Sequence, residues 1–388
     1  MAPRIIYITV FRQHAGKTVA SLGLLHLLRQ HYKPEDLGYI KPVGQELVEL
    51  EDGSKVDKDA LVIREFCDIP DLDMQYVSPV RLGSGFTKNY INSKNRAAET
   101  ETLKQKILES LDHFRHKKII VAEGTGHPGV GGVVELSNAA VGNLMNADIL
   151  FLSGGGIGKA LDMLEVDLTY FMYAKSNVRG IIFNKIIPEK IDTVRQFITK
   201  DLINEKYGRF PNQLNIFGYL PEMSRLSKPS MRVLLGKFST GRAIGNPEER
   251  AWTKDCNHIK VLSLAAEFLH PEEHIQPGDV VLLGAASRSR RSKLLMYQRA
   301  LGKGREIAGI ILTCGHTTPL DPQIEEQIRA SGIPTIYVQE DTAEAEEKII
   351  QAFETSKIQV YDCLKYENVK KLFTEHFNYR HLREILNL

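Results

Sequence analysis

A glycine-lysine-threonine triplet near the N-terminus is the first group of residues in this sequence that could do chemistry. Gly16, Lys17 and Thr18 close the stretch "TVFRQHAGKT" (residues 9–18), which follows an apolar run and precedes a helical pattern. A phosphate-binding loop needs backbone N–H groups at a helix start, a lysine for the β- and γ-phosphates and a hydroxyl for Mg²⁺. The triplet supplies the last part of such a loop in the right context.

The beginning of the same stretch departs from the common phosphate-loop pattern. The glycine that usually opens the loop is replaced by Phe11 under the common spacing, or by Val10 with one more spacer residue. A β-carbon there narrows the approach of the backbone to phosphates. Two interpretations stay open, a nucleotide-binding loop and a strand-to-helix turn with an exposed lysine. Under the first, the nucleotide site also includes the neighbouring residues His14, Ala15 and Val19.

Two charged residues at the ends of predicted strands favour the nucleotide-binding interpretation. Lys41, in "IKPVG", ends the second apolar run, and Glu123, in "VAEGTGHPGVGG", ends a later one and is followed by glycines. In a parallel sheet the carboxyl ends of the strands lie at one edge, where ligands bind. We therefore expect the second strand, which Lys41 ends, to lie beside the first, and the Glu123 carboxylate to face Mg²⁺.

Two aspartates and one asparagine complete the candidate site. Asp57 and Asp59 stand two residues apart in "VDKDA" at a helix start, where either could bind metal or cap the helix. Asn184 ends the strand "GIIFNK", where its amide could pair with an adenine edge or form a turn. Each residue alone has an ordinary structural explanation, and it is their joint occurrence that favours a site.

Six short apolar runs in the first part of the chain must position these residues. Their uninterrupted Ile, Val, Leu and Phe residues indicate strands that are covered on both faces. Amphipathic patterns such as 19–32 and 191–207 predict helices between them. This alternation predicts an α/β fold with a doubly wound parallel sheet. The predicted strands are residues 5–10, 37–43, 117–124, 147–155, 178–185 and 214–221.

The pattern changes near residue 223, where Ser, Pro, Gly and charged residues mix, and then a second series of apolar runs begins. We predict a first domain over residues 1–223, a smaller α/β domain over 224–355 and a helical C-terminal tail over 356–388.

The first domain resembles the dethiobiotin synthetase family of P-loop enzymes over roughly residues 1–222. In that family the loop has one spacer more than the common form and ends Gly-Lys-Thr, as "VFRQHAGKT" does here. The resemblance implies that Lys17 and Lys41 are catalytic residues and that Lys41 binds substrate and phosphate. It also implies ATP and Mg²⁺ as cofactors, and activation of a carboxylate or carbamate by phosphoryl transfer. Glutamine-dependent cobyrinic acid amide synthetases share this fold.

The same resemblance implies roles for the other candidates. Thr18, Glu123 and either Asp57 or Asp59 would bind Mg²⁺, and Asn184 would recognise the base. Related dimeric P-loop ATPases carry an additional lysine at the position of Arg12. Arg12 therefore either reaches a phosphate across a dimer or is a solvated loop residue.

The pair of domains resembles the N-terminal half of long bacterial phosphotransacetylases, in which a dethiobiotin-synthetase-like domain precedes a small domain named after its Asp-Arg-Thr-Gly-Gly motif (DRTGG). Residues 307–349 are similar to the latter half of that small domain, but the acidic residue of the motif is absent from "LLGAASRSRRSK". We expect no acetyltransferase domain, because too few residues follow the second domain. Its basic residues either bind an anion or form a solvated helix start; they are Arg288, Arg290, Arg291 and Lys293.

The bulk properties exclude several other classes of function. The 388 residues have 43% apolar and 25% charged content and a formal net charge of only +2, which does not indicate a nucleic-acid-binding protein. The four cysteines are widely spaced, which argues against a zinc site or a disulfide framework. With neither a signal peptide nor a membrane-spanning run in the sequence, we expect a soluble cytoplasmic protein without membrane partners.

Two hypotheses of function follow. The first is an ATP- and Mg²⁺-binding regulatory or interaction protein, linked to central or acetyl-CoA metabolism, in which occupancy of the first domain controls the second. The second is an ATP-dependent ligase of the dethiobiotin synthetase or amide synthetase type. A degenerate loop that no longer binds nucleotide is the third possibility. We expect a small anionic ligand and a homodimer or higher homo-oligomer.

Overall fold

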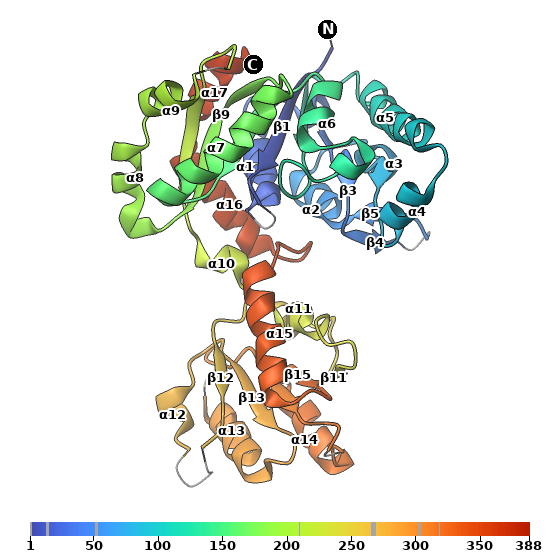
Figure 1. Cartoon of the computed structure of the whole chain (residues 1–388). Helices are drawn as coiled ribbons and strands as arrows, with labels where there is room; N and C mark the ends of the chain where they lie inside the picture. The colour runs from blue at the N-terminus through green and yellow to red at the C-terminus, as the bar shows by residue number, and fades with distance from the viewer. Residues whose placement is uncertain are drawn as a thin grey trace. The chain divides into compact units, whose positions relative to one another are not determined.

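The computed structural model describes residues 2–12, 15–50, 53–208, 210–264, 269–301, 304–317 and 319–388. The chain forms two compact units (Figure 1). Unit 1 comprises Met1–Met223 together with Ile358–Leu388, and unit 2 comprises Ser224–Lys357. The C-terminal helices, which the sequence separates as a tail, thus belong to unit 1.

Unit 1 is built on a six-stranded sheet in which every neighbouring pair of strands is parallel. The strand order is β10-β9-β8-β1-β7-β2. The central strands are buried almost throughout, as the uninterrupted apolar runs predict. The strands are β1 (Arg4–Val10), β2 (Leu37–Ile40), β7 (Ile119–Glu123), β8 (Asp148–Ser153), β9 (Val178–Ile186) and β10 (Asn215–Pro221).

Helices cover both faces of this sheet (Figure 1). The helices of unit 1 are α1 (Lys17–Arg29), α2 (Lys58–Cys67), α3 (Met74–Val77), α4 (Phe86–Asn92), α5 (Arg96–His113), α6 (Asn138–Leu144), α7 (Ile157–Tyr173), α8 (Ile191–Phe197), α9 (Lys200–Tyr207), α16 (Cys363–His376) and α17 (Tyr379–Leu386). Short strands form two further ribbons: β3 (Val43–Gly44) pairs with β6 (Val80–Arg81), and β4 (Leu47–Glu49) pairs with β5 (Lys55–Asp57).

The single amphipathic pattern at 191–207 corresponds to two helices, α8 and α9. Ile198 has a non-helical backbone conformation, and the Thr199 side chain accepts a hydrogen bond from the Leu202 N–H and so caps α9. A threonine in the middle of a helical pattern can stop one helix and start the next, because its hydroxyl satisfies an N-terminal N–H group.

Helix α16 packs against α1, the helix that begins at Lys17. A β-carbon on Gly23 of α1 would overlap the ring of Phe373 in α16, so the absence of a side chain at Gly23 permits the close approach. Residues at opposite ends of the chain therefore jointly support the helix that begins at Lys17.

Unit 2 contains a five-stranded sheet of order β11-β15-β14-β13-β12, in which only β11 is antiparallel to its neighbour. The strands are β11 (Arg242–Ile244), β12 (Ile259–Val261), β13 (Val280–Gly284), β14 (Gly309–Thr313) and β15 (Thr335–Tyr337). The helices are α10 (Ser224–Ser227), α11 (Met231–Leu235), α12 (Pro271–His274), α13 (Arg288–Ala300), α14 (Pro322–Ser331) and α15 (Thr342–Thr355). The predicted α/β class, with a parallel main sheet followed by a smaller α/β unit, is confirmed.

Single-turn 3-10 helices connect several of these elements, at Pro34–Asp36, Gly132–Val134, Pro188–Lys190 and Arg250–Thr253. Within the described ranges, none of the helices combines the length and apolar character needed to cross a bilayer.

A buried carboxylate on α7 leads to a testable prediction about stability. Asp167 is buried, its Oδ2 has no hydrogen-bond partner in the described part of the chain, and burial raises its pKa to about 7. The folded state therefore holds a proton that the unfolded state has already lost, and stability falls as pH rises from about 4 through 7. The full shift in the pKa of Asp167 corresponds to about 4 kcal/mol of lost stability at pH 8. Screening by solvent reduces this value, and we expect Asp167→Asn to stabilise the protein by about 2 kcal/mol at pH 8.

Urea unfolding at pH 8 and pH 5 measures this effect. The gain from Asp167→Asn should shrink at pH 5, and Asp162→Asn, which changes an exposed carboxylate on the same helix, should have little effect at either pH. Equal effects of the two substitutions at pH 8 would contradict the prediction.

Candidate functional site

The glycine of the triplet forms the turn between the loop and helix α1. Gly16 has a left-handed conformation, with φ 98° and ψ 30°, and is the N-cap residue of the helix. Lys17 and Thr18 are the first two residues of α1, so the N–H groups of its first turn have no helical partners. Val19 follows them and is half-buried. The N–H groups of such a helix start, with a lysine beside them, can bind an anion.

Replacing Gly16 with alanine tests this geometry. A β-carbon there would lie 2.7 Å from Asn184 Nδ2, and the positive φ is unfavourable for any residue with a side chain. We expect Gly16→Ala to destabilise the protein by about 1–3 kcal/mol in urea unfolding and to weaken nucleotide binding in calorimetry. Gly158→Ala in α7, where a β-carbon meets no atom within 4 Å, is the matched control and should not lower stability. Similar results for the two variants would argue against a required left-handed turn.

The start of the loop packs beside the end of β8, which is one of the two strands that neighbour β1. Phe11, at the position of the missing glycine, is buried, and a β-carbon on Gly154 after β8 would lie 2.9 Å from its ring. The Arg12 guanidinium is exposed and lies 5.3 Å from the centre of the same ring. His14, which we predict to contact nucleotide, lies outside the described residues.

Asn184 supports the loop from strand β9. Its Nδ2 donates a hydrogen bond to the carbonyl of Ala15 at 2.9 Å, and both residues are buried. This contact places Asn184 beside the loop that precedes α1, and it uses one N–H of the amide for the loop backbone. Adenine recognition by Asn184 stays a prediction.

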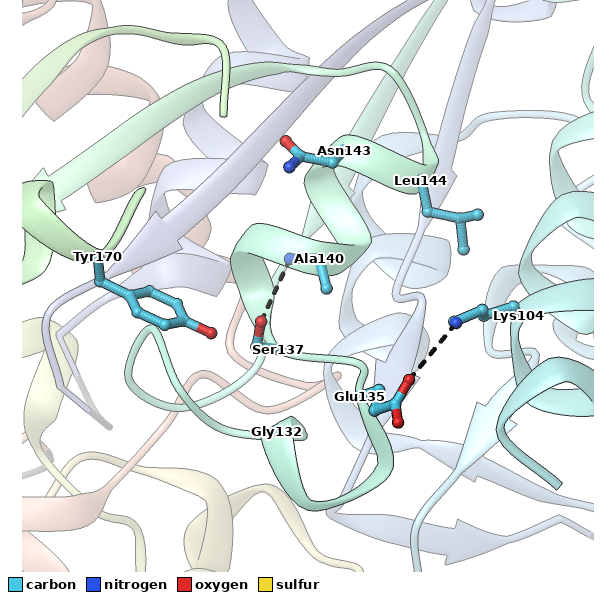
Figure 2. Close-up of a pocket in the computed structure, with 8 residues that line it drawn as sticks. All are labelled: Lys104, Gly132, Glu135, Ser137, Ala140, Asn143, Leu144 and Tyr170. Carbon is cyan, nitrogen blue, oxygen red and sulfur yellow. Dashed lines mark hydrogen bonds and ion pairs between the residues drawn. The ribbon is translucent and has the colours of Figure 1, made fainter. Parts of the chain in front are cut away.

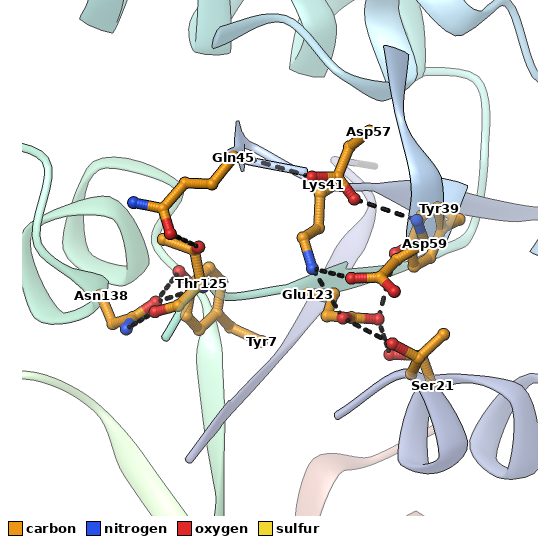
Figure 3. A network of polar contacts seen from close by, with 11 residues as sticks. Tyr7, Ser21, Tyr39, Lys41, Gln45, Asp57, Asp59, Glu123, Thr125 and Asn138 are labelled. Carbon is orange, nitrogen blue, oxygen red and sulfur yellow. Dashed lines mark hydrogen bonds and ion pairs between the residues drawn. The ribbon is translucent and has the colours of Figure 1, made fainter. Parts of the chain in front are cut away.

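Lys41 and Glu123 meet at the carboxyl edge of the sheet, where they follow and end the neighbouring strands β2 and β7. The expectation that the strand of Lys41 lies directly beside β1 is wrong, because β7 lies between them. Lys41 Nζ lies 2.7 Å from Glu123 Oε1 and 2.8 Å from Asp59 Oδ2 (Figure 3). Both carboxylate side chains and the lysine are buried. One ammonium group therefore joins two carboxylates in a dry environment, where ion pairs are strong only when hydrogen bonds are complete.

Four groups donate hydrogen bonds to the Glu123 carboxylate. Oε1 accepts from Lys41 and from Thr18 Oγ1 at 3.2 Å. Oε2 accepts from Ser21 Oγ at 2.9 Å and from Tyr39 OH at 3.1 Å. The hydroxyl of the Gly-Lys-Thr triplet is thus connected directly to the predicted metal-binding carboxylate.

The structure distinguishes the two neighbouring aspartates. Asp57 is the N-cap of α2: its Oδ1 accepts from the Asp59 N–H at 3.0 Å and its Oδ2 from the Gln45 N–H at 3.1 Å. A β-carbon on Gly44 would lie 2.9 Å from Asp57 Oδ2, so the glycine of "IKPVG" allows this approach. Asp59 points instead to Lys41 (Figure 3). The predicted metal ligand Asp57 is therefore engaged in capping, and Asp59 is the aspartate beside Glu123.

The cluster shifts the pKa values of its members. Burial works to lower the pKa of Lys41, but the carboxylates of Asp59, Glu123 and Asp57 outweigh it and the pKa is raised well above its usual value. Burial, only partly offset by Lys41, raises the pKa of Asp57 to about 6. Burial and the nearby Glu123 carboxylate raise the pKa of Tyr39 well above its usual range. Lys41 is thus charged and Tyr39 is a hydrogen-bond donor at neutral pH.

Sequence reasoning missed two residues of this cluster, Ser21 and Tyr39. Ser21 lies one helical turn after Thr18, on the same face of α1, and Tyr39 lies two residues before Lys41, on the same side of its strand. These spacings were the available signal. It was weak, because a serine in a helix and a tyrosine in a strand are common in any core.

A second buried network lies beside the cluster and joins Tyr7 of β1, Thr125 after β7 and Asn138 of α6. Asn138 Oδ1 accepts hydrogen bonds from Tyr7 OH at 2.8 Å and from the Thr125 N–H at 2.9 Å (Figure 3). Its Nδ2 donates to the carbonyls of Thr125 and His127. Asn138 therefore ties the glycine-rich loop after Glu123 to helix α6.

A cavity of about 640 Å³ lies near α6 and the side chain of Tyr170 in α7 (Figure 2). It is lined by Lys104, Gly132, Glu135, Ser137, Ala140, Asn143, Leu144 and Tyr170. None of the predicted site residues lines it, so it is separate from the lysine–carboxylate cluster.

The carboxylate and hydroxyl oxygens of the cluster are suitable ligands for Mg²⁺. This hard cation binds few protein ligands and completes its coordination with water molecules or phosphate oxygens. Thr18 Oγ1 and Glu123 Oε1 already lie 3.2 Å apart. In the described ranges, no group of three or more His, Cys, Asp or Glu side chains is arranged as a metal site on its own. The cluster therefore suits a cation whose coordination shell is completed by a bound ligand, and the protein side chains alone do not enclose it.

Two of the four basic residues at the helix start in unit 2 donate hydrogen bonds to the backbone. Arg290 Nη1 donates to the Leu262 carbonyl at 2.5 Å, and Arg291 Nη1 donates to the Ala285 carbonyl at 2.9 Å. Arg291 is buried, and burial lowers the pKa of its guanidinium. These two contacts position the helix, which favours the structural interpretation of the basic cluster over anion binding.

A parallel sheet, a left-handed glycine at the start of α1 and a lysine-threonine pair beside strand-end carboxylates define a P-loop nucleotide-binding domain. Residues 4–230 match the family model described as an AAA domain. The chain therefore belongs to this family. No curated protein matches the sequence.

Three solved structures are similar to parts of the chain. MinD from Aquifex aeolicus is 13% identical, with a TM-score of 0.33, covering 58% of this chain and 84% of that protein. A ParA family ATPase from Chlorobium tepidum TLS is 16% identical, with a TM-score of 0.33, covering 57% and 85%. The CBS and DRTGG domains of the regulatory region of Clostridium perfringens pyrophosphatase are 17% identical, with a TM-score of 0.26, covering 51% and 86%. None of the three reaches a TM-score of 0.5.

Proposed function

We propose that the protein binds ATP and Mg²⁺ in unit 1 and that nucleotide occupancy regulates unit 2 or its interaction with a partner. The observation that carries the proposal is the meeting of the phosphate-loop hydroxyl of Thr18 with the Glu123 carboxylate at the carboxyl edge of the sheet. A helix start with a lysine, a hydroxyl and a strand-end carboxylate within hydrogen-bond distance provides the parts that nucleotide–magnesium binding requires.

Each residue has a distinct part in this proposal. The N–H groups at the start of α1 and the Lys17 ammonium would hold the phosphates, with Ala15 and Gly16 forming the turn. Thr18, Glu123 and Asp59 would hold Mg²⁺, with Asp57 orienting Asp59 through the helix cap. Asn184 would contact the base. When bound, Mg²⁺ neutralises charge on the phosphates.

The alternative is an ATP-dependent ligase that activates a carboxylate or carbamate by phosphorylation. The position of Lys41 favours it, because a buried lysine beside the metal-binding carboxylates is well placed to hold an anionic substrate next to a phosphate. The second unit favours the regulatory function. Unit 2 adds 134 residues, Ser224–Lys357, which the small dethiobiotin synthetase ligases lack.

Hydrogen–deuterium exchange of the full chain tests the regulatory proposal. Adding Mg·ATP should change amide protection in unit 2 as well as around α1, because regulation requires that nucleotide binding alters the second unit. Protection confined to unit 1 would contradict it. Incubation with ATP, 7,8-diaminopelargonate and bicarbonate tests the alternative, and formation of dethiobiotin would establish the ligase.

The proposal includes a DRTGG-like identity for unit 2, an unidentified small anionic ligand and a homo-oligomeric state. It also includes a place in the cytoplasm, linked to central or acetyl-CoA metabolism. Size-exclusion chromatography with light scattering, with and without Mg·ATP, measures the oligomeric part of it.

A further inference from the structure

Glu123 has no free lone pair in this structure. An ionised carboxylate offers about four lone-pair positions, two on each oxygen. All four face donors: Lys41 Nζ and Thr18 Oγ1 at Oε1, and Ser21 Oγ and Tyr39 OH at Oε2. A metal ion can therefore coordinate Glu123 only after one of the donors leaves.

Lys41 is the donor that a metal ion must displace. Ser21 and Tyr39 are neutral, buried and set within α1 and β2, on the other oxygen of the carboxylate. Thr18 shares Oε1 with Lys41, but its hydroxyl would bind the same cation. Lys41 carries a positive charge at the end of a flexible stem, so a cation that approached Oε1 would meet a like charge at hydrogen-bond distance.

The departure of Lys41 would remove one donor from each of two carboxylates, Glu123 and Asp59. Its Nζ holds Glu123 Oε1 at 2.7 Å and Asp59 Oδ2 at 2.8 Å, so both oxygens face the place that the ammonium occupies. A buried ammonium needs a new counter-charge when it leaves two carboxylates. An oxyanion, such as a terminal phosphate or a substrate carboxylate beside the phosphate loop, provides one.

We propose that Lys41 is a resident cation that keeps the metal site closed until an anionic ligand draws its ammonium away from Asp59 and Glu123. The inference rests on the proposed nucleotide site and adds its regulation: the divalent cation alone binds weakly, and anion and metal bind cooperatively. Because such coupling is reciprocal, the metal also strengthens binding of the anion.

Binding of Mn²⁺ alone to the full chain, followed by the electron paramagnetic resonance signal of the free ion, tests the proposal without nucleotide or turnover. Wild type should bind Mn²⁺ weakly, and Lys41→Met should bind it at least about 10-fold more tightly, because the resident cation is gone. Lys41→Arg keeps the charge and should not show the gain, and neither should Lys33→Met, which removes an exposed cation. Equal Mn²⁺ affinity of wild type and Lys41→Met, or an equal gain in Lys41→Arg, would overturn the proposal.

A second comparison applies if Lys41→Met does not fold. Asp59→Asn removes one buried carboxylate, so that the loss of Lys41 leaves less uncompensated charge. The double variant Lys41→Met/Asp59→Asn should still bind Mn²⁺ more tightly than Asp59→Asn alone. Thermal unfolding gives an independent readout, since Mn²⁺ should raise the melting temperature of the double variant more than that of Asp59→Asn. Equal shifts would overturn the proposal.

The two proposals fail separately. If wild type does not bind Mg·ATP, the proposed function is wrong whatever the Mn²⁺ results. If it binds Mg·ATP but Lys41→Met gains no Mn²⁺ affinity, the nucleotide site stands and the role of Lys41 as a resident cation is wrong.

Discussion

Replacing Lys17 with alanine is expected to weaken Mg·ATP binding by about 100-fold in isothermal titration calorimetry. Lys17 is the first residue of α1, directly after the left-handed turn at Gly16, and is the one lysine of the phosphate loop. A charge-assisted hydrogen bond to phosphate contributes roughly 1.5–3 kcal/mol, which corresponds to about 10- to 100-fold in affinity. The upper value is expected because the side chain is buried and solvent screening is weak.

Lys206→Ala is the matched control, because it removes an exposed lysine from α9 in the same unit. Circular dichroism and urea unfolding should show that Lys17→Ala is folded, so that lost binding reports on the site. Equal titrations for wild type and Lys17→Ala would end the phosphate-loop interpretation and favour a degenerate loop in which Phe11 has replaced the opening glycine.

The replacement of Glu123 with leucine should cause the largest loss of stability among the substitutions considered. Glu123 is fully buried and accepts four hydrogen bonds, and its removal leaves Lys41 with one carboxylate partner in place of two. Breaking a buried ion pair by removing one partner typically costs about 3–5 kcal/mol. We expect a decrease of about 4 kcal/mol in the free energy of unfolding, measured in urea at pH 7.

The double variant Lys41→Met/Glu123→Leu shows whether the ion pair is the cause. Because both charges are removed together, its loss of stability should be clearly smaller than the sum of the two single losses, with a coupling energy of about 1–3 kcal/mol. Asp59 loses the ion pair with Lys41 in the double variant, so recovery should be incomplete. Additive losses would mean that Lys41 and Glu123 do not interact in solution.

The local features of the site could be predicted from the sequence because they depend on neighbouring residues. Gly16, Lys17 and Thr18 are consecutive, and a strand before them with a helix after them is enough to place a lysine and a hydroxyl at a helix start. The parallel sheet followed from uninterrupted apolar runs, since strands covered on both faces need no alternation. The edge at which Lys41 and Glu123 meet followed from the same rule for parallel strands.

Features that depend on the path of the backbone or on distant residues could not be predicted in the same way. Asp57 and Asp59 are both plausible caps or ligands by type and spacing, and only the backbone direction at the start of α2 assigns capping to Asp57. The pattern at 191–207 concealed a helix boundary at Thr199, because apolar periodicity continues across it. The attachment of α16 to α1 involves residues about 350 positions apart, such as Gly23 and Phe373, for which the sequence carries no local signal.

The sequence by itself determined the α/β class and the residue types of a phosphate loop, because both depend on short-range patterns of apolarity, glycine and charge. Only the tertiary structure decided which charges face each other. Lys41, Asp59 and Glu123 come from three separate segments, and their contact depends on the order β1-β7-β2 within the sheet and on the path of the chain into α2. Electrostatic energy in a buried site depends on distances of a few ångströms between such segments, and no spacing along the chain encodes those distances.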